Sequence, residues 1–134
     1  MGPEILLVAL GGALGGVARH VLSGLVDGRT GKSFPWGTLA VNASGALALG
    51  LLAGALLGPG APAPDSLPWA FLAVGALGSY TTVSSFSLQT LALLEGGRPT
   101  AAGWNVLLSF GLCLLAAGLG LMGGSAIAGL GGSG

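Results

Sequence analysis

The chain contains very little charge. Only eight of its 134 residues are Asp, Glu, Lys or Arg, and the two signs balance at pH 7. About a quarter of the residues in a soluble domain are charged, so this composition excludes an ordinary soluble globular protein. A neutral chain also lacks the basic surface that nucleic-acid binding requires. Together with a mean hydropathy of +0.89, the low charge predicts a membrane protein.

Residues that usually carry chemistry are equally scarce. The chain has one cysteine and one histidine, which excludes an intrachain disulfide framework and a cluster of Cys and His ligands for a metal. Cys113 lies in an apolar run, where a packing role is expected. His20 lies in a different predicted span, and no motif links the two to a nucleophile arrangement. We therefore do not expect an enzyme.

Four apolar stretches are long enough to cross a bilayer, which takes about 20 helical residues. The predicted spans cover residues 5–26, 37–58, 67–94 and 101–128. The connectors between them are rich in Gly, Pro and charged residues, a composition typical of turns and loops. The sequence thus predicts an all-α integral membrane protein whose residues 1–134 form a single domain of four transmembrane helices. The closing GLGGSG predicts a flexible tail.

Glycine is abundant, and it lies among Leu, Ala and Val rather than in polar segments. In membrane helices, small residues spaced four apart let two helix backbones approach closely. The first predicted span contains such a set at Gly11, Gly12, Gly15 and Gly16, and the second contains one at Ala46, Gly50, Gly54 and Gly58. We expect both sets to lie at close helix contacts.

The third predicted span has a polar middle. The segment GSYTTVSSFS, residues 78–87, carries seven hydroxyl side chains in ten residues. An unbroken helix over residues 67–94 would measure about 42 Å, against a hydrocarbon core of about 30 Å. Gly75 and Gly78 weaken the helix just before Thr81 and Thr82, whose hydroxyls compete for backbone groups. We therefore expect a break between Gly78 and Thr82, and with it an ion or ligand site at mid-membrane.

The type of ion follows from the side chains available. Amide and hydroxyl donors lie on the polar faces of the spans, whereas the acidic residues, Glu4, Asp27, Asp65 and Glu95, all lie at predicted span ends or in loops. A cation or proton path would normally contain a buried acid, so donors without acids favour a small anion. Arg19, toward the end of the first predicted span, supplies a fixed positive charge that would concentrate anions in a vestibule. Carbonyls freed by the break would suit a small cation such as sodium.

Three motifs resemble the Fluc (CrcB-type) fluoride ion channel family. They are GGALGGVAR at residues 11–19, PWGTLAVNASGALALG at 35–50 and GSYTTVSSFS at 78–87. The resemblance covers all four spans and implies a passive fluoride channel that exports fluoride across the cell inner membrane and so lowers its toxicity. It also implies an antiparallel, dual-topology homodimer with two pores, and a structural sodium ion at the interface between the subunits.

The resemblance also assigns roles to individual residues. It implies that the backbone carbonyls of Gly78 and Thr81 hold the sodium ion. It implies a pore lined by Asn42, Ser84, Ser85, Ser109 and Phe86, with Arg19 in the vestibule. The family usually has a phenylalanine where this chain has Val83, which offers no electropositive ring edge to an anion. Fluoride conduction is expected to persist, with Phe86 making the larger ring contribution.

Structural interpretations of the same residues stay open at this point. Ser and Thr in membrane helices often bond to their own backbone, and a membrane Asn often bridges two helices, as Asn42 would. Arg19 lies near a span end, where a long side chain extends to the interface. Two other classes of protein are also considered. A small proton-coupled multidrug exporter would need a carboxylate within a span, and a non-transporting assembly subunit would not explain the polar break.

The loop charges conflict with dual topology. Arg29, Lys32 and Arg98 fall on one side of a four-span arrangement, and the opposite loop and the termini hold no Lys or Arg. The positive-inside rule would place those three residues in the cytoplasm. A dual-topology protein requires little charge bias. The antiparallel homodimer is therefore expected from the resemblance and not from the charges.

Overall fold

The computed structural model describes residues 2–56 and 65–132, and these residues form helices joined by short turns. Four helical segments are long and apolar enough to cross a membrane, judged by length and composition: Pro3–Thr30, Trp36–Leu56, Leu67–Glu95 and Pro99–Gly131. No strand occurs among the described residues. The predicted all-α fold with four spans is confirmed.

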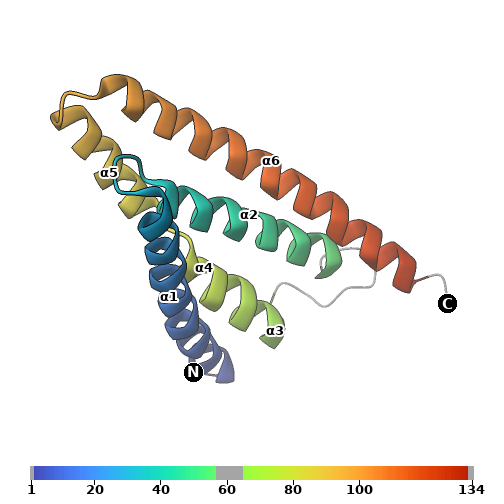
Figure 1. Ribbon diagram of the computed structural model, residues 1–134. Helices are drawn as coiled ribbons and strands as arrows, with labels where there is room; N and C mark the ends of the chain where they lie inside the picture. The colour runs from blue at the N-terminus through green and yellow to red at the C-terminus, as the bar shows by residue number, and fades with distance from the viewer. Residues whose placement is uncertain (1, 57–64, 133–134) are drawn as a thin grey trace.

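The spans pack in two pairs. Helix α2, Trp36–Leu56, lies alongside α6, Pro99–Gly131, while α1, Pro3–Thr30, packs against the first half of the third span (Figure 1). The α1–α2 and α5–α6 connections meet at one end of the molecule, where the Arg98 guanidinium donates to the Ser33 carbonyl. Helix α1 begins and helix α6 ends away from these connections (Figure 1).

The third span is broken near its middle, as the sequence predicts. Its first half is a continuous helix made of α3, Leu67–Trp69, η1, Ala70–Leu77, and α4, Gly78–Tyr80; its second half is α5, Val83–Glu95. Between the halves the backbone is extended at Thr81 and Thr82, with φ of −79° and −152° and ψ of 158° and 125°. The wide π-helical winding of η1 was not predicted.

Glycines interlock α2 with α6. Gly50 and Gly54 face the backbone of α6, and an added Cβ would collide with the carbonyl oxygens of Ala117 and Leu121. The contact is reciprocal, because a Cβ on Gly120 or Gly124 of α6 would collide with the α2 backbone. Close contacts are confirmed for these members of the second set. The first set is confirmed in part, since Gly11 and Gly15 press on η1 whereas Gly12 faces open space.

Several predicted element ends need correction. Helix α1 continues to Thr30, so Asp27 lies in its last turn and not in a loop, and its Oδ1 accepts a 2.9 Å hydrogen bond from the Gly37 N–H. Gly31, with φ of 81°, stops the helix there. Helix α6 continues to Gly131, so the expectation of a flexible tail is wrong for residues 129–131. Gly58, the last member of the second glycine set, lies outside the described residues.

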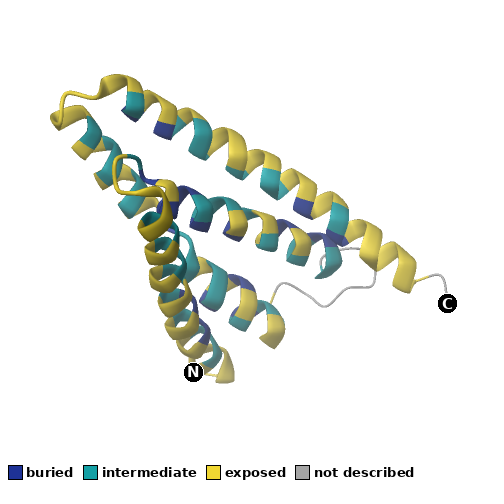
Figure 2. Ribbon diagram, viewed as in Figure 1, coloured by how far each residue is buried: buried dark blue, intermediate teal, exposed yellow. Residues whose placement is uncertain are grey.

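The buried core is small and the outer surface is apolar. Five apolar residues are buried in the part of the chain that the structure describes: Leu39, Val41, Ala70, Ala73 and Ala102. Large apolar side chains are exposed along α1 and α6, where most of each ribbon is yellow in Figure 2. A soluble domain would bury these side chains, whereas lipid or a partner subunit covers them in a membrane. The chain is a multi-pass membrane protein.

Candidate functional site

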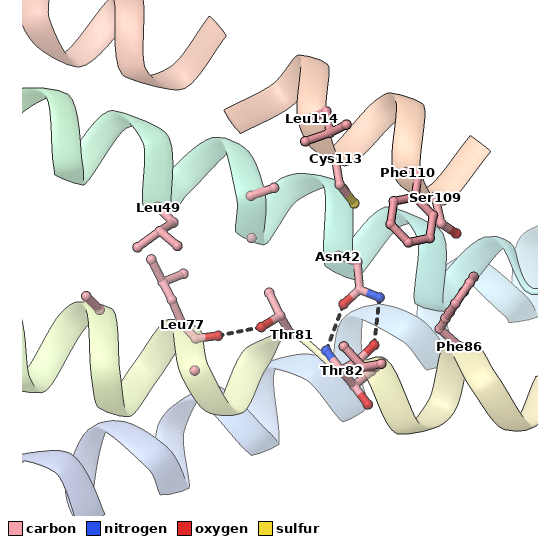
Figure 3. A pocket seen from close by; sticks show the side chains of 15 residues that line it. Asn42, Leu49, Leu77, Thr81, Thr82, Phe86, Ser109, Phe110, Cys113 and Leu114 are labelled. Carbon is pink, nitrogen blue, oxygen red and sulfur yellow. Dashed lines mark hydrogen bonds between the residues drawn. The ribbon is translucent and has the colours of Figure 1, made fainter. Parts of the chain in front are cut away.

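Asn42 on α2 bonds directly to the broken backbone of the third span. Its Nδ2 donates to the Thr82 carbonyl at 2.8 Å, and its Oδ1 accepts from the Thr82 N–H, also at 2.8 Å (Figure 3). The side-chain amide therefore satisfies both backbone groups of one residue at the break. An amide on a short side chain suits this task, because it offers a donor and an acceptor side by side.

The break removes the helical donors of several carbonyl groups, among them those of Gly78 and Thr81. In an unbroken helix the Thr82 N–H would donate to Gly78 and the Ser85 N–H to Thr81. Here the Thr82 N–H donates to Asn42, and the Ser85 N–H donates to Thr82 Oγ1 at 3.2 Å. Thr82 thus caps the start of α5. The carbonyls of Gly78 and Thr81 are released from the helical pattern as a result.

The Ser and Thr side chains of residues 81–87 fall into two groups by their hydrogen bonds. Thr81 and Ser87 donate to carbonyls of their own helices, at 3.0 and 2.9 Å, as is common for hydroxyls in membrane helices. Ser84 and Ser85 instead cluster around Thr82, whose Oγ1 lies 3.1 Å from Ser84 Oγ and 3.3 Å from Ser85 Oγ. Because Thr82 donates its one hydroxyl hydrogen to Ser85, Ser84 must be the donor to Thr82, which leaves the Ser85 hydroxyl hydrogen uncommitted within this cluster.

Two cavities meet at Thr82. The first has a volume of about 640 Å³ and lies between the break, α2 and α6; the second has a volume of about 220 Å³ and lies between α1, α2 and the start of α5. The first is lined mostly by apolar side chains, as Figure 3 shows around Asn42. The second is more polar and includes Arg19, His20 and Ser23. Among the described residues, no Asp or Glu lines either cavity.

A third cavity lies at the end of the molecule where the two connections meet. It has a volume of about 500 Å³, and its lining includes Asp27, Lys32 and Arg98. Gln89 of α5 also lines it, and the Gln89 Oε1 atom is buried with no hydrogen-bond partner in the part of the chain that the structure describes. A buried polar atom normally has a partner, so this atom is a candidate for contact with water.

The structure brings most of the predicted site residues to these cavities. Asn42, Val83, Phe86 and Ser109 line the first cavity together with Gly78 and Thr81, while Arg19 and Ser85 line the second. Ser84 lines neither of them and is exposed. Val83 is 77% exposed, so its side chain has room around it. These placements are findings, whereas a role in binding an ion stays a prediction.

Other residues of the site were not predicted. Phe110 of α6 meets Phe86 edge to face, with ring centroids 6.3 Å apart. The Tyr80 hydroxyl lies 2.8 Å from Ser44 Oγ. Thr90 accepts a 2.9 Å hydrogen bond from the Asn105 amide. The sequence spacing gives a partial indication for Thr90, which lies one helical turn after Phe86 and so shares its helix face.

Four apolar spanning helices, one of them broken and bonded at mid-span to a polar side chain, define a multi-pass helical membrane protein. The family described as CrcB-like protein, Camphor Resistance (CrcB), matches residues 6–121. The chain belongs to this family.

Similar proteins carry a consistent name. The chain is 45% identical over 118 residues to "Fluoride-specific ion channel FluC 2" of Bradyrhizobium diazoefficiens, with 88% of this chain and 86% of that protein covered. It is 50% identical over 123 residues to "Fluoride-specific ion channel FluC 2" of Rhodopseudomonas palustris, covering 87% and 88%. It is 49% identical over 119 residues to "Fluoride-specific ion channel FluC" of Rhodospirillum rubrum, covering 88% and 92%. These relatives are ion channels and not enzymes, in agreement with the expectation from the sequence.

Proposed function

We propose that the chain is the subunit of a fluoride-selective channel through which fluoride leaves the cytoplasm passively, lowering its toxicity. The observation that carries this proposal is the broken third span, where Asn42, Ser85 and Ser109 line cavities without any acidic side chain among the described residues. The names of the relatives support the choice of fluoride.

The donors at the break match the needs of a small, strongly hydrated anion. A pore for such an ion must replace its water shell with strong donors at several successive steps. The Asn42 amide has two N–H groups, and one of them is used on Thr82, which leaves the second for an ion in the first cavity. Ser109 lines the same cavity, and Ser84 and Ser85 extend the row along α5. Larger halides would be excluded by the close packing of the glycine-rich helices.

Aromatic and cationic groups complete the proposed route. The edge of an aromatic ring is electropositive, so Phe86 can contribute to an anion site with its ring edge. Val83 cannot do so, although it lines the same cavity. Arg19 lines the second cavity and raises the local anion concentration there. Phe86 is therefore the ring contribution that α5 makes in this chain.

The proposal includes an antiparallel homodimer with two pores and a sodium ion. The lining of the first cavity includes Val83, Phe110 and Leu114, which are exposed in the single subunit, and a second copy would complete its wall. The residues also fit a small hard cation, because the break releases the Gly78 and Thr81 carbonyls, and carbonyl oxygens are suitable ligands for sodium at membrane depth. Two subunits would supply two such pairs of oxygens.

The other two classes fit less well. A proton-coupled exporter needs a titratable carboxylate within a span, but Asp27 lies in the last turn of α1 and holds the Gly37 N–H. The other acids of the described residues lie at helix ends or outside the helices. A subunit that transports nothing would not need a break that exposes donors to two cavities. Passive anion conduction therefore accounts for more of the structure.

Ion efflux from liposomes containing the purified protein tests the proposal. We expect rapid fluoride efflux and chloride efflux close to that of protein-free liposomes. Equal rates for the two ions, or no fluoride efflux, would reject the assignment, and proton-driven uptake of a cationic dye would favour the exporter. In a further arm, sodium is replaced by a large organic cation from purification onward. Fluoride efflux should then fall, and an unchanged rate would remove the sodium ion from the proposal.

A further inference from the structure

Helix α5 carries Ser84, Ser85 and Phe86, which are proposed to face the ion, yet no residue of α5 is buried. None of the residues Val83–Glu95 is buried in the subunit. One side of the helix is half-buried and the opposite side is exposed (Figure 2); the half-buried side consists of Ser85, Phe86, Gln89, Thr90 and Leu93. Close packing of large side chains normally fixes the rotation of a helix. In α5 the rotation of the helix must instead depend on a small number of specific contacts.

Asn105 of α6 makes one of these contacts. It is only 2% exposed and is one of the two largest fully buried side chains. Its Nδ2 donates to Thr90 Oγ1 at 2.9 Å, and Thr90 Oγ1 donates to the Phe86 carbonyl at 2.8 Å. A hydroxyl has one hydrogen, so with that hydrogen on the carbonyl Thr90 can only accept from the amide. The two hydrogen bonds therefore run from the buried Asn105 amide on α6, through the Thr90 hydroxyl, to the backbone carbonyl of Phe86.

A second contact lies one helical turn away. The rings of Phe86 and Phe110 meet edge to face, with centroids 6.3 Å apart and planes 80° apart. Both rings line the first cavity. A hydroxyl that bonds its own helix is ordinary in a membrane span, but here the hydroxyl also receives a bond from a buried amide on another helix. The polar contact and the ring contact both join the half-buried side of α5 to α6.

We propose that Asn105, acting through Thr90, is a positioning residue for Phe86. It holds α5 at the rotation that directs the Phe86 ring into the first cavity and against Phe110. The consequence for fluoride rests on the proposed function, whereas the contact itself can be tested without any ion. Neither Asn105 nor Thr90 needs to touch the ion for this role.

Thr90→Val tests the effect on conduction, because valine has nearly the shape of threonine and lacks its hydroxyl. We expect fluoride efflux to fall about three- to tenfold, as for one lost hydrogen bond, and Thr90→Ser to stay near the wild-type rate. In a Phe86→Ile background, Thr90→Val should cause no further loss, because the two residues act as one unit. A wild-type rate in Thr90→Val would overturn the inference. The same fractional loss in both backgrounds would also overturn it.

A spectroscopic measurement separates this inference from the proposed function. The chain has four phenylalanines, and labelling them with 4-fluorophenylalanine gives ¹⁹F signals from Phe34, Phe71, Phe86 and Phe110. The Phe86 signal should move in Thr90→Val and in Asn105→Leu but not in Thr90→Ser, and the Phe71 signal should not move in any of them. An unmoved Phe86 signal in Thr90→Val overturns the inference whatever the efflux. A moved signal in a protein that conducts no fluoride supports the contact and rejects only the channel.

Discussion

At the residue scale, the sequence could not decide whether Asn42 bridges two helices or contacts an ion, and the structure is compatible with both roles. It bridges α2 to the third span through both backbone groups of Thr82. Unpaired backbone groups at mid-membrane each cost several kcal/mol, so this bridge is what makes the break tolerable. The bridge uses one N–H of the amide and leaves the other. A structural role for Asn42 is therefore compatible with the proposed contact to an ion.

The single aromatic ring on α5 leads to a prediction about Phe86 and Val83. Phe86→Ile should lower fluoride efflux by roughly tenfold, because the electropositive ring edge is lost and Val83 offers no substitute. Adding Val83→Phe to that variant should restore part of the rate, since position 83 is 77% exposed and has room for a ring. Initial efflux rates from liposomes of equal protein content provide the measurement. An unchanged rate in Phe86→Ile would show that the ring has no part in conduction.

Local spacing and the family resemblance predicted part of the site. They led to Asn42, Phe86 and Ser109, which line one cavity together. The predicted polar residues are divided between two cavities because of the way α1 passes the break. No local sequence pattern contains that tertiary arrangement. Thr90 was missed for a related reason. One threonine in an apolar helix is unremarkable until its partner on another helix is known.

At the element scale, the glycine contact between α2 and α6 allows a matched comparison. Gly124→Ala would place a Cβ against the Leu51 carbonyl and should destabilise the protein by about 1–3 kcal/mol through overpacking. Gly118→Ala is the control on the same helix, because an added Cβ there meets nothing within 4 Å. It should be neutral or slightly stabilising, since alanine favours a helix over glycine. Thermal unfolding in detergent measures both, and equal midpoints would contradict the close contact.

Length and composition predicted the elements better than their winding or their ends. The number of spans follows from apolar length, and the break follows from a span that is too long and carries glycines before a hydroxyl row. The π-helical turns of η1 were not predictable from the local sequence; within them Gly75 packs on Val8 and Gly11 of α1. That contact belongs to the tertiary structure. The α1 end was misplaced because the helix runs past the apolar stretch to Thr30.

At the scale of the whole molecule, the basic residues of the loops and helix ends are gathered at one end. Arg98 reaches the Ser33 carbonyl, and Lys32 and Arg98 line one cavity with Asp27. The opposite end holds Glu4 and Asp65 and no Lys or Arg. The positive-inside rule predicts a single orientation for this distribution. An antiparallel dimer predicts both orientations in equal amounts, so orientation is the property on which the two predictions differ.

Cysteine labelling of the two ends in intact cells decides between them. In a Cys113→Ala background, Ser33→Cys marks the end with the basic residues and Asp65→Cys marks the opposite end; both native residues are exposed. We expect a membrane-impermeant maleimide to label about half of each variant, because antiparallel pairing places equal numbers of each end outside. Permeabilised cells should label fully and provide the control. If only Asp65→Cys reacts in intact cells, the charge bias fixes the orientation and the antiparallel homodimer is excluded.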